Sequence, residues 1–154
     1  MSGPPGRMLL ISLALSLAAC APQGPAGPTP VSTEARRLVA ELGPAYSAAD
    51  LDNGRLRFNL CRSCHLISAG GLNAVGPNLY GVFGRRVASA PAFSYSQALR
   101  AQAFAWDAAH LDVWLTNPRA YVPGTKMSFV GLKDATDRRD LIAYLKVASS
   151  GGGT

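Results

Sequence analysis

Apolar residues recur at helical spacing in four stretches of the chain. In the first, Thr33 can cap a helix with apolar positions at 35, 38, 39 and 42, and Gly43-Pro44 ends it. The second starts at Asp50, carries apolar or small residues at 51, 54 and 58, and is expected to continue into the stretch CRSCH at 61–65. The third runs from about 107 until Pro118 breaks it, and the fourth covers roughly 135–148. Glycine- and proline-rich loops without alternating strand patterns connect them. The pattern predicts a small all-α, loop-rich domain.

The first 32 residues follow a different pattern. Arg7 precedes an uncharged apolar stretch, residues 8–19, which has the length of a signal-peptide core. A helix that spans a bilayer needs about 20 apolar residues, so this stretch is short for that role. Residues 17–20, LAAC, resemble the lipoprotein box, which predicts a signal peptide over 1–19 and lipidation of Cys20. An ordinary signal peptide that contains a cysteine and an uncleaved anchor are the alternatives.

The remaining boundaries follow from composition. Proline and glycine dominate residues 21–30, so residues 20–32 are expected to form the lipidated cysteine and a tether. Residues 33–47 are expected to form a short amphipathic helical extension, which docks on the domain or on a partner. The domain itself is expected over 48–149, followed by a flexible tail over 150–154. A domain of this size with long loops buries limited apolar area, which favours a large apolar cofactor in its interior.

Charge narrows the choice of partner. The chain has 154 residues and a formal net charge of +6. A moderate positive charge suits an acidic protein surface or anionic lipid. No run of Lys and Arg and no basic stripe with interleaved aromatic residues is present, so nucleic acid is disfavoured.

The stretch CRSCH, residues 61–65, carries the chemistry. On a helix, Cys61, Cys64 and His65 would lie on one face and converge on a zinc ion, a redox disulfide, an iron–sulfur cluster or a covalent haem. No cysteine follows Cys64, and His110 alone cannot complete a zinc site or a cluster. A thioredoxin-like dithiol needs a strand–helix setting that the pattern lacks. C-x-x-C-H is typical of c-type haem attachment.

In this interpretation Cys61 and Cys64 form thioethers with the haem, and His65 binds the iron. Met127 is the single methionine outside the leader, and it lies in the turn-rich stretch VPGTKMSFVG. It is therefore the candidate for the second iron ligand, with a core-filling methionine as the alternative. Ligation by His and Met raises the reduction potential. His110 is expected to be exposed or a satisfied edge residue and not a ligand.

From about residue 48 to 149 the chain resembles the class I c-type cytochromes of mitochondrial type. The resemblance is carried, in the family's order, by G-x-x-x-F at 54–58, CRSCH, GPNLYGVFGR, APAFSYS, LTNPRAYVPGTKM and DLIAYLK. It implies a few helices wrapped around one covalent haem c, with one haem edge at the surface. It also implies that Gly54 and Phe58 pack against Leu141 and Tyr144, where two helices cross.

The resemblance further implies roles around the haem. Pro77 would offer its carbonyl to the second nitrogen of His65, and Thr125 would belong to an internal hydrogen-bond network. Donors to a buried propionate would be Arg85, Tyr95 and Trp106. Trp114 stands beside Met127 where the family has a tyrosine, and Leu99 where it has an asparagine. The loop after CRSCH carries no lysine, while residues 119, 126 and 133 match basic positions near the exposed edge.

The expected function is that of a monomeric one-electron carrier and not of an enzyme. By resemblance, the donor is a cytochrome bc-type complex and the acceptor a haem–copper oxidase or a reductase, met through an acidic patch. The expected location is the periplasmic face of a bacterial membrane, the inner one favoured, with a lipid anchor. Two alternatives stand beside this: a peroxidase-like or gas-binding protein if Met127 leaves the iron, and an electron-entry subunit of a dehydrogenase.

Overall fold

The computed structural model describes residues 1, 3 and 31–151. Cys20, most of the leader and tether, and residues 152–154 lie outside the described residues. Between residues 31 and 151 the chain forms helices and long loops, and the one β-bridge there, between Arg86 and Ala105, is isolated. This confirms the all-α, loop-rich fold. The elements are α1 (Thr33–Ala40), the 3-10 turn η1 (Pro44–Tyr46), α2 (Leu51–Phe58), α3 (Gln97–Arg100), α4 (Ala108–Thr116), α5 (Pro118–Tyr121) and α6 (Ala135–Ser149).

The helix boundaries follow from capping side chains. Asp50, Asp107 and Asp134 each accept a backbone N–H at the start of α2, α4 and α6. The prediction that Thr33 caps the first helix is wrong by one residue, because the hydroxyl of Ser32 accepts the N–H of Ala35.

The sequence predicts that Pro118 ends the third helix. This helix, α4, does end before Pro118, at Thr116, and Pro118 is also the first residue of α5. Proline suits this position because its missing N–H has no partner in a first turn. The turn η1 and the four-residue helices α3 and α5 were not expected from the sequence. They are too short to show an apolar period.

Helix α6 lies at the centre of the helical part, and α2 crosses it closely. A Cβ atom added at Gly54 would run into the carbonyl of Asp140 and the Cβ of Tyr144, so only glycine allows this approach. The ring of Phe58 packs on that of Tyr144 with centroids 5.6 Å apart, and Leu141 is buried in the same core. The expected helix crossing is therefore present.

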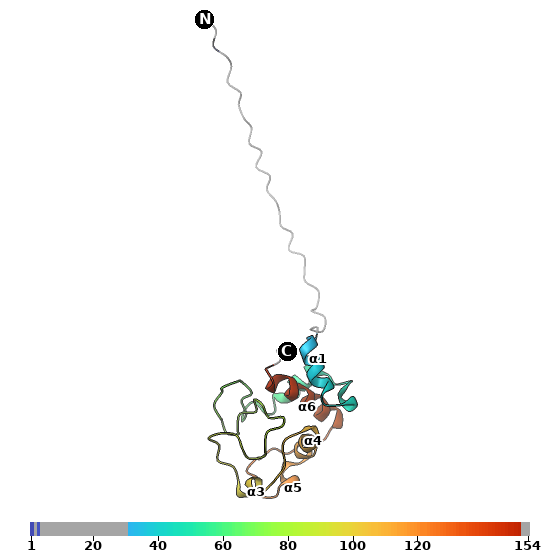
Figure 1. The fold of residues 1–154 in the computed structure, drawn as a ribbon, viewed down its shortest axis with the longest axis vertical. Coiled ribbons are helices and arrows are strands. Elements are labelled where there is room, and N and C mark those ends of the chain that lie inside the picture. Colours follow the sequence, from blue (N-terminus) through green and yellow to red (C-terminus); the bar gives the residue numbers. More distant parts are fainter. Residues whose placement is uncertain (2, 4–30, 152–154) are drawn as a thin grey trace. The chain divides into compact units, whose positions relative to one another are not determined.

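The amphipathic helix α1 packs on α6 near the start of α2 (Figure 1). Ala35 and Leu38 are buried against Val147, and the carboxylate of Glu41 lies 2.8 Å from the ammonium of Lys146. Of the two positions left open by the sequence, the structure shows the one on the domain. The apolar face of α1 is consequently covered by its own chain.

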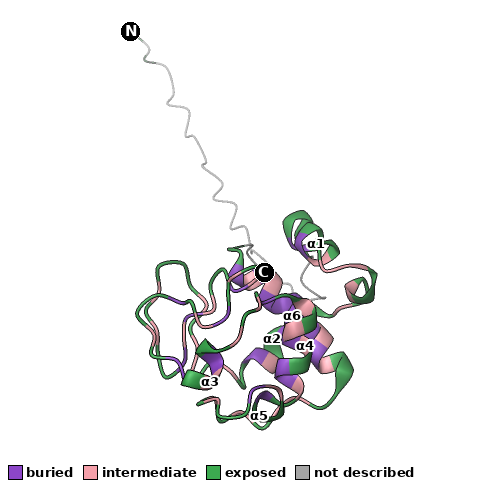
Figure 2. Ribbon diagram, turned by 60° about the horizontal axis from the view of Figure 1, so that its bottom comes forward, coloured by how far each residue is buried: buried purple, intermediate pink, exposed green. Residues whose placement is uncertain are grey.

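The long loops lie on the opposite side of α6 and α4 from α1. Figure 2 shows the buried residues concentrated along α6 and α4, with mixed exposure along the loops between α2 and α4. Residues 59–96 contain no helix or strand. Among the described helices, none has the length and apolar character required to cross a membrane.

Candidate functional site

A cavity of about 320 Å³ lies between these loops and helices α3, α4 and α6. Its lining is mostly apolar, as is usual for cofactor sites, and its volume falls in their range. Every residue that sequence analysis assigned to the cofactor lines this one cavity. These residues are Cys61, Cys64, His65, Pro77, Arg85, Tyr95, Trp106, Trp114, Thr125 and Met127.

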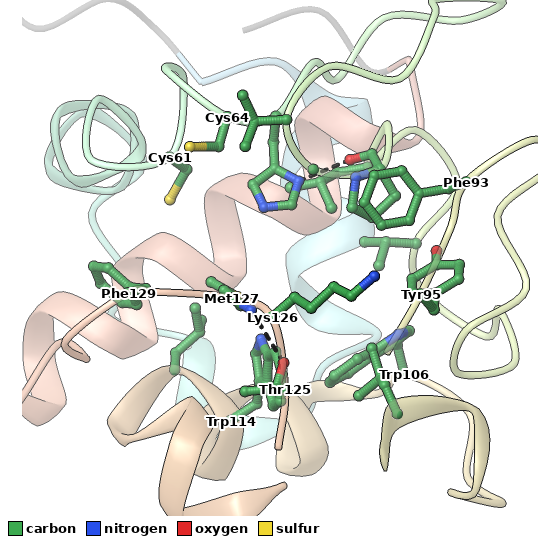
Figure 3. Close-up of a pocket in the computed structure, with 18 of the residues that line it drawn as sticks. Cys61, Cys64, Phe93, Tyr95, Trp106, Trp114, Thr125, Lys126, Met127 and Phe129 are labelled. Atoms are coloured by element: carbon green, nitrogen blue, oxygen red, sulfur yellow. Dashed lines mark hydrogen bonds between the residues drawn. The ribbon is translucent and has the colours of Figure 1, made fainter. Parts of the chain in front are cut away.

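The CRSCH stretch reaches the cavity from a series of turns. The expectation that it continues a helix is wrong, because α2 ends at Phe58. The chain then turns tightly, with the N–H of Cys61 donating to Phe58 O and the N–H of His65 donating to Cys61 O. These turns bring both cysteines and the histidine to the cavity. Figure 3 shows Cys61 and Cys64 together at one side of it.

Cys61 and Cys64 do not form a disulfide with each other. Burial, with a smaller contribution from Cys64, raises the pKa of Cys61 to about 11. A thiol with that pKa is protonated at neutral pH. Between residues 31 and 151, no three His, Cys, Asp or Glu side chains are grouped closely enough to hold a metal ion.

His65 is held by the segment Gly76-Pro77. Its Nδ1 donates to the carbonyl oxygen of Pro77 over 2.7 Å, as the resemblance implied. Burial lowers the pKa of His65, although the bond to Pro77 acts in the opposite direction. The imidazole is therefore neutral at pH 7, with Nε2 available to bind a metal. A Cβ atom at Gly76 would run into the His65 ring, so glycine is required there.

Met127 lies across the cavity from the two cysteines (Figure 3). Its backbone N–H donates to the hydroxyl of Thr125 over 3.2 Å, and the N–H of Thr125 donates to Val122 O. The indole of Trp114 is buried beside them and contacts Trp106 edge to face, with ring centroids 5.4 Å apart. Lys126 extends along the cavity toward Tyr95 in the same view.

Arg85, Tyr95 and Trp106 line another part of the cavity. The guanidinium of Arg85 donates to the carbonyls of Asn78 and Tyr80, each over 3.1 Å. The hydroxyl of Tyr95 accepts the N–H of Ala90 over 3.2 Å. Burial lowers the pKa of Arg85 from a high ordinary value and raises that of Tyr95, so Arg85 remains a cation at neutral pH. A half-buried cation of this kind suits a carboxylate ligand.

His110 lies outside the cavity lining. Its Nδ1 is 2.8 Å from the carboxylate of Asp107, and its ring stacks on Phe104 with centroids 4.5 Å apart. Both contacts are those of a satisfied edge residue.

Sequence reasoning missed two residues near the site, Asn73 and Asn78. Asn78 is 9% exposed and hydrogen-bonds to three segments of the loops. A Pro-Asn pair is a turn signal, which could have marked Asn78. Those hydrogen-bond partners of Asn78 that are distant in sequence carry no such signal.

The residues of the cavity fit a haem. An apolar, partly open space suits the ring, while the two thiols, the imidazole and the thioether come from chemically suitable positions on its wall. Arg85 and Tyr95 supply polar groups for the acidic end of such a ligand. The fold and this site define a small helical protein that closes around one prosthetic group.

Three relatives agree with this class. The chain is 48% identical over 106 residues to a cytochrome c-type cyt cy of Rhodobacter capsulatus, covering 68% of this chain and 52% of that one. It is 46% identical over 101 residues to cytochrome c2 of Rhodomicrobium vannielii, covering 66% and 81%. It is 43% identical over 101 residues to cytochrome c of Gibberella zeae, covering 65% and 95%. No family model matches the chain.

The chain belongs to the class I c-type cytochromes. Like its relatives it binds one covalent haem c and is an electron-carrier cytochrome, not an enzyme. The match spans about half the length of the Rhodobacter relative.

Proposed function

We propose that this chain is a one-electron carrier whose haem iron is ligated by His65 and Met127. The observation that supports this most is that both side chains line one cavity together with Cys61 and Cys64. A neutral imidazole and a thioether are both ligands used for haem iron. When bound, the haem supplies an iron that takes up and releases one electron.

The chain's own residues have separate tasks in this proposal. Cys61 and Cys64 fasten the group covalently, so it stays bound when a ligand exchanges. Pro77 fixes the orientation of His65 through the Nδ1 hydrogen bond, as partners of metal-bound histidines do. Arg85, Tyr95 and Trp106 would hold the propionates of the haem, and Trp114 and Thr125 line the cavity with Met127.

We further propose that redox partners dock at the mouth of the cavity. Leu60 and Val75 line the cavity and are still 55% and 78% exposed, so they mark its apolar mouth. Residues 53–106 contain no Asp or Glu. Arg62 and Lys126, both exposed, add positive charge near this mouth.

A partner with an apolar patch bordered by carboxylates fits this surface. The donor proposed is a quinol-oxidising cytochrome bc-type complex, and the acceptor is a haem–copper oxidase or a reductase. Small transient interfaces are typical of such electron transfer, and the carrier is proposed to act as a monomer.

Anchoring is the remaining part of the proposal. The composition of residues 1–32 supports export, lipidation of Cys20 and attachment to the periplasmic face of the inner membrane. A tether keeps the carrier concentrated near membrane-bound partners. Intact mass of the mature protein tests this, because a diacylglyceryl cysteine at its N-terminus adds a defined mass.

The function itself is tested by stopped-flow spectroscopy with purified complexes. We expect the bc-type complex to reduce the holoprotein and the oxidase to reoxidise it, each in a second-order reaction. A variant with Met127→Leu serves as the control for ligation, since it keeps the covalent group but removes the thioether. Absence of electron exchange with both complexes would contradict the proposal.

A further inference from the structure

The side of the cavity that holds His65 has no regular secondary structure. No helix or strand occurs between residues 59 and 96, so backbone polar groups there depend on turns and side chains for partners. Something else must hold Gly76-Pro77 firmly against the histidine. Two asparagine side chains supply most of the hydrogen bonds behind this segment.

The segment Gly76-Pro77 contacts the CRSCH stretch three times. The N–H of Gly76 donates to Cys64 O over 2.7 Å, and Pro77 O accepts from His65 Nδ1 over 2.7 Å. The Cα of Gly76 lies against the His65 ring, where no Cβ fits. The position of Pro77 therefore decides the position of the imidazole.

Asn78 fixes Pro77 from the following residue. Its Nδ2 donates to Ser68 O and to Gly71 O, each over 2.9 Å. Its Oδ1 accepts the N–H of Tyr80 over 2.8 Å. Its backbone O accepts from Arg85 over 3.1 Å. Both side-chain protons and both backbone polar groups of this buried residue are in use.

Asn73 connects Asn78 to a third loop. Its Oδ1 accepts the backbone N–H of Asn78 over 2.9 Å, and its Nδ2 donates to Pro91 O over 2.8 Å. Residues 68–71, 78–80 and 91 are thus joined through two side chains. A network with all members satisfied holds its loops in one arrangement.

We infer that Asn73 and Asn78 form a positioning pair that sets the orientation and electron-donating strength of His65 through Pro77. The inference rests on the proposed ligation of the haem by His65. A firmly held carbonyl acceptor makes the imidazole a stronger donor to its metal. Loosening Pro77 weakens that donation, which destabilises the ferric form relative to the ferrous form and raises the reduction potential.

The experiment uses the exported holoprotein with Asn78→Leu, which keeps the branched, four-heavy-atom shape of the side chain but removes its three hydrogen bonds. Asn73→Ala is the second variant, since it leaves the Asn78 side chain intact. Asn53→Ala is the matched control. Asn53 is a half-buried asparagine that hydrogen-bonds to Asp137 and Asp140 between α2 and α6.

NMR of the His65 Nδ1 proton and a redox titration are the two readouts. In Asn78→Leu we expect solvent exchange of that proton to rise about tenfold or more, together with a higher reduction potential. Asn73→Ala shifts both in the same direction by less. Asn53→Ala lowers the melting temperature but moves neither readout.

Two failures are distinguishable. If the wild-type spectrum shows no iron-shifted histidine ring signals, the proposed ligation by His65 fails before any variant is compared. The positioning inference is overturned if those signals are present and both Asn78→Leu and Asn73→Ala lose stability without a change in proton exchange or reduction potential. The asparagines would then be structural only. Should Asn78→Leu not fold, the result with Asn73→Ala alone decides.

Discussion

The carboxylate of Glu41, one residue after α1, lies 2.8 Å from the ammonium of Lys146 near the end of α6. The hydrogen bond and charge of Lys146 lower the pKa of Glu41. This pair closes a small apolar cluster of Ala35, Leu38 and Val147, separate from the core around the cavity. Residues 31–47 are thus part of the packed domain.

The first prediction concerns this cluster. Leu38 is 5% exposed, so Leu38→Ala removes buried methyl groups and leaves a void. We expect a loss of about 2–3 kcal/mol in the free energy of unfolding, measured by urea denaturation of the holoprotein. Arg36→Ala, at an exposed position on the same helix, is the control and should change little. Equal stabilities would show that α1 does not contribute to the fold.

The loop at 86–93 contains backbone strain. Ala88 and Ala92 both have φ near +54°, in the left-handed region where glycine is favoured. Replacing either by glycine relieves the steric penalty but adds unfolded-state entropy. We expect Ala88→Gly and Ala92→Gly each to stabilise the protein by about 0.5–1 kcal/mol.

Thermal unfolding followed by circular dichroism measures this effect. Ala90→Gly is the matched control in the same loop, because Ala90 is buried and does not have positive φ. That change should destabilise. If all three substitutions destabilise alike, the loop is not strained in the way described.

Acid stability provides a third prediction through Asp140, which is 1% exposed. Burial alone would raise the pKa of Asp140, but hydrogen bonds from Asn53, Arg139 and the Asp50 backbone outweigh it, so the pKa lies below its ordinary value. In the unfolded chain this carboxylate binds its proton at higher pH. Its stabilising effect is therefore complete above the unfolded pKa and is lost as pH falls below about 4.

Urea unfolding midpoints recorded from about pH 7 down to pH 3 check this sign. Asp140→Asn should lower the stability at neutral pH, and the stability of this variant should decrease less as the pH falls. Asp52→Asn, which alters an exposed carboxylate on α2, is the comparison. A parallel acid dependence in wild type and Asp140→Asn would be inconsistent with the role assigned to Asp140.

The fourth prediction concerns docking. The mouth residue Leu60 is exposed and apolar, so electron transfer to an oxidase should depend less on salt than for a carrier with lysines there. Leu60→Lys adds a charge at this mouth and should steepen the fall of the second-order rate with ionic strength. Leu56→Lys, at another exposed leucine outside the cavity lining, is the control. A steep salt dependence already present in wild type would argue against an apolar encounter.

Much of this architecture is readable from the sequence because its signals are local. Three motifs specify local geometry: the spacing of CRSCH, the GP pair before Asn78, and G-x-x-x-F. The last one puts Gly54 and Phe58 on the face of α2 that packs against α6. Contacts between loops distant in sequence have no periodic pattern. The bond from Asn73 to Pro91 and the packing of α1 on α6 are of this kind.

Short elements were also beyond prediction. The helix α3 spans four residues, and the turn of CRSCH after Phe58 depends on how α2 meets α6. Tertiary packing decides where such segments end. The ten candidate cofactor residues nevertheless line one cavity. Eight of them lie in the stretches that resemble the family, whereas Trp106 and Trp114 lie outside those stretches.

The absorption spectrum of the oxidised protein at neutral pH tests the central claim most directly. If the thioether of Met127 is an iron ligand together with His65, a weak red band from the iron–sulfur bond is present in wild type and absent in Met127→Leu. A wild-type spectrum without that band, or a band that survives in Met127→Leu, would contradict the account.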